Sequence, residues 1–178
     1  MPPPPASVWD GLLDAVAAVV RDTLDTVGRL DPEYAKFGLA GVPVVRRSWP
    51  AGVFPQDRRP TAVVGPAGPE RLDPMTGEDD EKLFGLYPVQ VTLYGPPATP
   101  GVSAPPAVGR WLLAARPAVR KALLNWLALA PALPAGVSLD DCDDREAGRA
   151  GTITPYFPVT DLDATAVGVQ YRTVEPRT

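Results

Sequence analysis

The chain of 178 residues has room for a single domain with its own core. Its formal net charge is −4 and no basic stripe is present, which argues against a protein that holds nucleic acid by its phosphates. The single cysteine excludes an intrachain disulfide, and no apolar run is long enough to span a bilayer as a helix.

Proline and glycine are unusually frequent, with 24 and 16 residues. The prolines cluster at 2–5, 96–106 and 131–134, which indicates long loops around a compact core. We expect a single domain over residues 1–178, with residues 1–6 as a flexible proline-rich arm. The N-terminus lacks a basic region before an apolar run, so we expect no secretory signal.

The first predicted element is an amphipathic helix from an N-cap at Ser7 to about Val27 or Leu30, with Gly28 as its terminator. Acidic residues in its early turns suit the dipole of a helix N-terminus. The residues of its apolar stripe recur at helical spacing: Trp9, Leu12, Leu13, Val16, Val19, Val20, Leu24 and Val27.

Two short strands are predicted next, at Val42–Trp49 and Thr61–Val64. A loop, with a short turn at 33–37, precedes the first, and a turn-rich connection links the two. Residues 67–82 are polar and interrupted by prolines, so we expect a surface loop or a hairpin there.

The stretch Glu78–Tyr94 begins as a solvated acidic run and continues as a half-buried strand. Its residues alternate with a period of two, which places these on one face: Tyr87, Val89, Val91 and Leu93. Pro88 has no N–H to donate to a sheet, so we expect it at the first residues of the strand or on an edge.

A second amphipathic helix is predicted between Val108 and Ala130 and ended by Pro131 and Pro134. Pro117 lies inside this pattern, which predicts either two helical pieces or a bend near Arg116. The expected apolar stripe consists of Trp111, Leu112, Ala115, Val119, Ala122, Leu123, Trp126, Leu127 and Ala130.

After this helix, Val137–Leu139 leads into the acidic run Asp140–Asp144. We predict a broken strand at Thr152–Val159 and a last strand at Ala164–Val174. This order of elements predicts an α+β fold. We expect a mixed or antiparallel sheet of about four to five strands, two main helices packed on one face, and long proline-rich loops.

The residue inventory offers little catalytic chemistry. Without histidine the chain has no Ser-His or Cys-His pair and no imidazole metal ligand. Cys142 lies among carboxylates, which raise a thiol pKa and make it a poor nucleophile. The acidic runs Glu78–Glu81 and Asp140–Asp144 lack the spacing of an EF-hand loop, so we interpret them as solvated loop rims.

Two further features are interpreted structurally. The segment 65–69 contains too much proline to cradle a phosphate and does not lead into a helix. Trp9, Trp111 and Trp126 are predicted to anchor the core, whereas Trp49 is expected at a surface or interface. We therefore predict no catalytic, cofactor-binding or metal-binding residue, and no enzyme activity.

Several segments together suggest a family: the strand ending near Trp49, RPTAVVGP, the acidic run into LYPVQVTLY, RPAVRKALLNWL, and AVGVQYRTVE. In this order, after a leading helix, they resemble the tail terminator and related neck (head–tail joining) proteins of long-tailed phages and prophages. The resemblance covers residues 7–130 and 160–176. The proline-rich loops at 96–106 and 131–158 look longer than in that family.

The resemblance implies an α+β structural protein of a virion tail or neck, assembled in the host cytoplasm. Its expected partners are copies of itself in a hexameric ring, the major tail tube protein and the head–tail connector. DNA would be passing cargo only, and no cofactor or membrane is expected. The alternatives are another head–tail adaptor or tail-tube-associated protein, and a small-molecule-binding module or enzyme.

Overall fold

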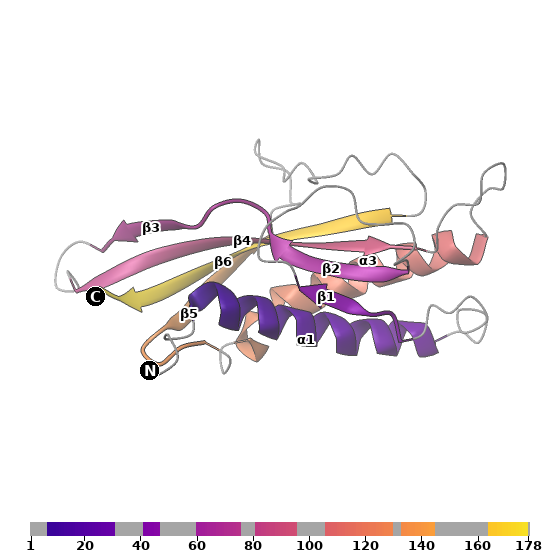
Figure 1. The fold of residues 1–178 in the computed structure, drawn as a ribbon, viewed down its shortest axis with the longest axis horizontal. Helices are drawn as coiled ribbons and strands as arrows, with labels where there is room; N and C mark the ends of the chain where they lie inside the picture. The colour runs from indigo at the N-terminus through magenta and orange to yellow at the C-terminus, as the bar shows by residue number, and fades with distance from the viewer. Residues whose placement is uncertain are drawn as a thin grey trace, which may run out of the picture.

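A computed structural model describes residues 7–30, 41–46, 60–75, 81–95, 106–129, 133–144 and 164–177 (Figure 1). The expectations for residues 31–40 and 47–59, and for the strand at 152–159, lie outside this part of the chain. The described elements follow in this order: α1 (Val8–Arg29), β1 (Val44–Arg46), β2 (Thr61–Pro66), β3 (Arg71–Pro74), β4 (Lys82–Tyr94), α3 (Pro106–Leu124), a 3-10 turn η2 (Trp126–Ala128), β5 (Ser138–Asp144) and β6 (Ala164–Pro176).

The strands form one open, mixed sheet in the order β1-β2-β4-β6-β5, and β3 pairs with β4 beyond the end of β2. Only the pairing of β1 with β2 is parallel among the described strands. The expected α+β fold is confirmed, with six strands among the described residues rather than four to five. Two of these six, β3 and β5, were not predicted as strands. β3 arises because the segment after β2 adopts the hairpin alternative and returns along β4.

The centre of the sheet is the antiparallel pair of β4 and β6, which matches Lys82 with Pro176 at one end and Tyr94 with Ala164 at the other. The predicted alternation holds on β4, because its odd-numbered residues from Tyr87 to Leu93 are all buried in the core. Three of their four direct partners on β6 are fully buried as well: Val167, Val169 and Tyr171. The fourth, Thr165 opposite Leu93, is partly buried.

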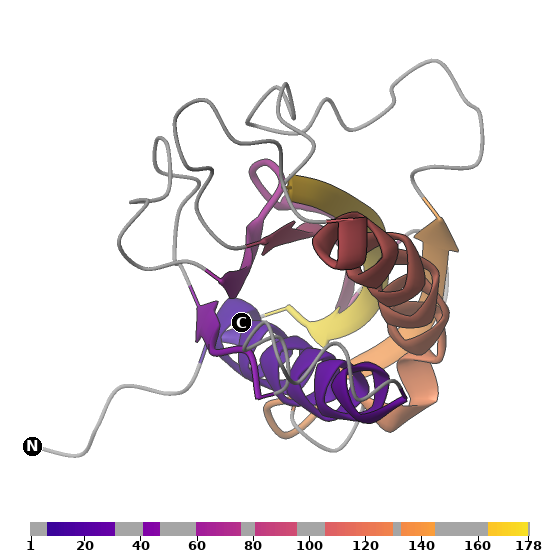
Figure 2. The ribbon, with the colours of Figure 1, turned by 90° about the vertical axis from the view of Figure 1, so that its right-hand side faces the viewer.

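Both helices lie on this face of the sheet and pack against each other (Figures 1 and 2). α1 covers the β1–β2 side, and α3 covers the β6–β5 side. Their apolar stripes complete one continuous core with the sheet. The helical residues of that core are Leu12, Leu13, Val16, Ala17, Val20, Leu24, Val27, Leu112, Ala115, Val119 and Leu123.

The prediction that β4 is only half-buried is wrong for its second half. Gln90, Thr92 and Tyr94 point to the face away from the helices, yet they are only 5%, 4% and 3% exposed. The amide nitrogen of Gln90 donates a hydrogen bond of 3.0 Å to Thr92 Oγ1. This end of β4 is therefore buried on both faces, which is typical of a central strand.

Pro88 lies in the interior of β4, so its predicted place at a strand start or an edge is also wrong. On one side it is matched with Gln170 of β6. On the other side it falls between the ladders of β2 and β3, where its carbonyl accepts from Ala67 N at 2.7 Å. The ladder is interrupted at this point, and a residue without an N–H is accommodated there.

The predicted first helix is confirmed, including its N-cap. Ser7 Oγ accepts from the backbone N–H of Asp10 at 3.0 Å, which satisfies one of the free donors at the helix start. Gly28 is not the terminator, because the helix continues to Arg29 with Leu30 as its C-cap. Gly28 is instead buried within the last turn.

The second helix differs more from expectation. α3 runs through Pro117 without separating into two pieces there, and it ends at Leu124, before the predicted prolines. A 3-10 turn then follows Asn125. This change of geometry moves Leu127 out of the predicted apolar stripe, and 66% of its surface is exposed.

The remaining boundaries shift modestly. β1 covers Val44–Arg46 of the predicted Val42–Trp49, β2 continues through Gly65 to Pro66, and β6 extends the last predicted strand to Pro176. β5 begins at Ser138 and contains the whole acidic run Asp140–Asp144. The acidic run is therefore an edge strand, and its interpretation as a loop rim is wrong.

Candidate functional site

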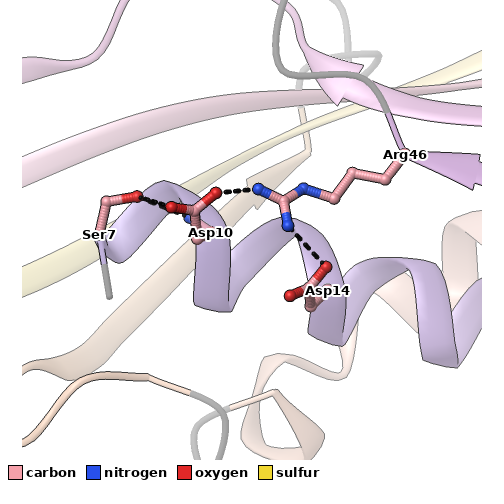
Figure 3. Close-up of polar contacts among 4 residues, drawn as sticks. All are labelled: Ser7, Asp10, Asp14 and Arg46. Atoms are coloured by element: carbon pink, nitrogen blue, oxygen red, sulfur yellow. Dashed lines mark hydrogen bonds and ion pairs between the residues drawn. The ribbon is translucent and has the colours of Figure 1, made fainter. Parts of the chain in front are cut away.

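Arg46 fastens the edge strand β1 to α1 (Figure 3). Its Nη1 donates to Asp14 Oδ1 at 2.8 Å, and its Nη2 makes a second ion pair with Asp10 Oδ1. Asp10 in turn accepts from the Ser7 hydroxyl at 2.7 Å. The guanidinium pairs with two carboxylates on successive helical turns and so fixes the position of the strand along the helix.

A second group of polar side chains, which we call the Tyr87 cluster, joins α1 to one end of the sheet. It consists of Trp9, Glu70, Tyr87, Thr173 and Glu175. Oε1 of Glu175 accepts from the Tyr87 hydroxyl at 2.7 Å and from the Thr173 hydroxyl at 2.6 Å.

The Trp9 ring meets Tyr87 edge to face, with centroids 5.0 Å apart, and its Nε1 donates to Glu70 Oε2 at 2.9 Å. The N-terminal turn of α1 is thereby tied to the segment before β3 and to β4. This confirms a structural role for Trp9 at the edge of the core, as predicted.

The cluster depends on a glycine. Gly85 is the direct partner of Thr173 across the β4–β6 ladder. A Cβ atom at this position would collide with the Glu175 carboxylate, the Thr173 hydroxyl and the Tyr87 ring. The absence of a side chain at Gly85 is what leaves room for Glu175 to fold back across the strand.

The pKa values of Tyr87 and Glu70 in the cluster are shifted away from neutral pH. Burial, together with the bond to Glu175, raises the pKa of Tyr87 well above its usual value of 10.0, so the phenol stays a donor. The hydrogen bond from Trp9 lowers the pKa of Glu70 below its usual value of 4.5. Neither change supplies a group that exchanges protons near neutral pH.

The acidic strand β5 has two distinct faces. Asp141 and Asp143 lie 3.7 and 3.5 Å from the guanidinium of Arg172 on β6. Cys142 points to the core side, and its sulfur lies 3.7 Å from the carbonyl oxygen of Leu123. The cysteine is thus a partly buried packing residue. The carboxylates of Asp141 and Asp143 lie on the other side of the strand from its thiol, and Asp141 Oδ1 accepts from the Cys142 backbone N–H at 2.8 Å.

The other residues considered in the sequence are not brought together. Of the first acidic run, only Glu81 belongs to the described residues, and it is exposed. Trp126 packs against the core, whereas Trp49 and the side chain of Trp111 lie outside the described part. Gly65 and Pro66 belong to β2, and β3 rather than a helix follows them.

Sequence reasoning missed both polar arrangements because their members are distant in the chain. Trp9 and Glu70 are 61 residues apart, and Tyr87 and Glu175 are 88 apart. The one usable signal was Gly85, a glycine inside a strand, which indicates close approach of another group.

Among the described residues, no group of three or more potential metal ligands is arranged around one point. No helix in the same part of the chain is both long and apolar enough to cross a membrane. Comparison with protein-family models and with curated protein sequences finds no match to this chain.

Proposed function

We propose that this protein is a structural component of a phage-like particle, a tail-terminator-like neck protein. In this role it forms a ring that caps the tail tube and joins it to the head connector. The observation that supports this most directly is the architecture, since one α+β sheet on two helices is what the family resemblance implies.

The overall charge of the chain also supports this role. The net charge of −4 suits a conduit through which DNA passes without being held.

The proposed partners are five further copies of the chain in a six-fold ring, the major tail tube protein and the head–tail connector. The place of action is the tail or neck of the particle, after assembly in the host cytoplasm. No cofactor and no catalytic step belong to this function.

Native mass spectrometry and negative-stain microscopy at micromolar concentration test the ring. The protein should then be mixed with tail tubes assembled from the major tail protein of the same particle. Six-fold rings, alone or at the ends of tubes, are expected. Monomers in both preparations would contradict the proposal, and binding to the connector without binding to tubes would assign the adaptor role instead.

A further inference from the structure

One end of the sheet, formed by β3, β4 and β6, extends past the N-terminal end of α1 (Figure 1). Trp9, in the first turn of the helix, contacts Tyr87 of β4. Before Tyr87, the same face of β4 continues at every second residue, with Gly85 and then Leu83. These positions therefore lie beyond the part of the sheet that the helix covers.

The helix-facing side of this sheet end carries an apolar strip. On β3, Leu72 is the direct partner of Gly85, and Pro74 is the direct partner of Leu83. Directly opposed residues of an antiparallel pair point to one face, so both leucines and Pro74 share the face of Tyr87. Leu72 is 46% exposed, Pro74 is exposed and Leu83 is partly exposed. We call Leu72, Pro74 and Leu83 the β3–β4 strip.

The proline-rich arm before α1 has the chemistry to cover this strip. Residues 1–6 read MPPPPA and contain no charged side chain. Consecutive prolines have a fixed φ and no N–H, so such a segment favours polyproline II and binds through its apolar rings rather than as an added strand. The N-cap Ser7 leads into the arm with φ −70° and ψ 153°, which are values of polyproline II.

The length of the arm and the point where it joins α1 agree with this strip. Residues 2–6 span about 16 Å in polyproline II, at about 3.1 Å per residue. The arm joins the helix beside Tyr87, and from Tyr87 to Leu83 β4 spans about 13 Å, at about 3.3 Å per residue. The arm is thus long enough for the strip. It is too short for Leu30 at the other end of α1, about 33 Å along the helix axis.

We propose that residues 2–5 dock in polyproline II conformation on the β3–β4 strip of the same chain. The proline rings then remove the exposed apolar surface of Leu72 and Leu83 from water. Because the arm is joined to α1 at Ser7, its local concentration at the strip is on the order of millimolar, so a weak contact suffices. The docked arm closes this end of the sheet to other molecules. The contact does not rest on the proposed ring, and the failure of either leaves the other intact.

Disulfide formation within the full chain tests the contact. Cys142→Ser removes the native thiol, and Pro3→Cys with Leu72→Cys places one thiol on the arm and one on the strip. Under mild oxidation, intact-mass spectrometry and non-reducing electrophoresis should show a monomer with an internal disulfide. The matched control combines Pro3→Cys with Leu30→Cys, because Leu30 is 71% exposed but beyond the reach of the arm. This control should form no internal disulfide.

Glycine substitutions separate docking from the random encounters of a tethered arm. Pro2→Gly, Pro4→Gly and Pro5→Gly keep the length of the arm and remove its rings and its preferred conformation. Together they should slow the disulfide between Pro3→Cys and Leu72→Cys about fivefold or more, because only the tether then brings the thiols together. Circular dichroism should show that every variant is folded. Equal rates with the proline and glycine arms, an equally fast disulfide to Leu30→Cys, or linked dimers in place of internal disulfides would each overturn the proposal.

Discussion

Tyr87 is held by neighbours of two different kinds, an aromatic ring from α1 and a carboxylate from β6. Tyr87→Phe keeps the ring contact with Trp9 and removes only the bond to Glu175. We expect a loss of about 0.5–1.5 kcal/mol in the free energy of unfolding, typical of one hydrogen bond. Urea denaturation measures this, and Tyr87→Leu, which also removes the aromatic contact, should lose more. Equal losses in the two variants would mean that the ring contact with Trp9 adds no stability.

The bond between Trp9 and Glu70 predicts a dependence of stability on acid pH. The pKa of Glu70 is lower in the folded protein than its usual 4.5, so its carboxylate stabilises the fold above that value. This contribution is lost as the pH falls through the folded pKa. Denaturation midpoints between about pH 3 and pH 6 should therefore fall less steeply in Glu70→Gln than in the wild type. Parallel curves would show that the bond contributes nothing.

Pro117 makes α3 the element with the clearest internal conflict. A proline inside a helix removes one hydrogen bond and crowds the preceding turn, at a cost of about 3 kcal/mol or more. Because Pro117 is exposed, Pro117→Ala should restore the bond without changing the core. We expect Pro117→Ala to have a higher midpoint in thermal denaturation than the wild type. As a control, Ala118→Pro should have a lower one. A lower midpoint in Pro117→Ala would mean that the proline is required for the shape of α3.

Elements with a single repeating pattern were predictable from the sequence. The apolar residues of α1 recur with a period of 3.6 residues, and those of β4 and β6 with a period of two. In each case this period identifies the face of the element that is buried. β5 was not predictable, because four aspartates in five residues favour a loop. Its pairing with β6 and the proximity of Arg172 outweigh that local preference. The place of Pro88 depends likewise on where β2 leaves the ladder, which no local pattern encodes.

At the scale of the whole molecule, we expect the two halves of the stretch Glu78–Tyr94 to have different roles. The strand is required for folding, whereas the acidic run affects at most assembly. Val91 is fully buried between the helices and β6, so Val91→Asp places an unpaired charge in the core and should abolish cooperative unfolding. The Asp79→Ala/Asp80→Ala double variant should stay folded, as seen by circular dichroism, and at most alter assembly. Loss of folding in that double variant would contradict the prediction that the acidic run is not needed for folding.

The polar contacts between elements could not be read from the sequence, whereas the core largely could. Burial follows local periodicity, but the partner of a polar residue depends on which strands become neighbours. Nothing in the sequence around Arg46 identifies Asp10 and Asp14 as its partners. The exposed leucine at 127 also depends on the break at Asn125, a change of helix geometry rather than of composition.

The long ladder between β4 and β6 has a consequence for the order of events during synthesis. Each of its pairs joins residues far apart in the chain, such as Lys82 and Pro176. Closing such separated contacts is slow, because the loop entropy is lost before any pairing compensates it. On the ribosome, β4 can pair with β2 and β3, which precede it, but its other edge stays unpaired until β6 has emerged. This central strand is therefore where nascent chains are most exposed to misassociation and where chaperones would act.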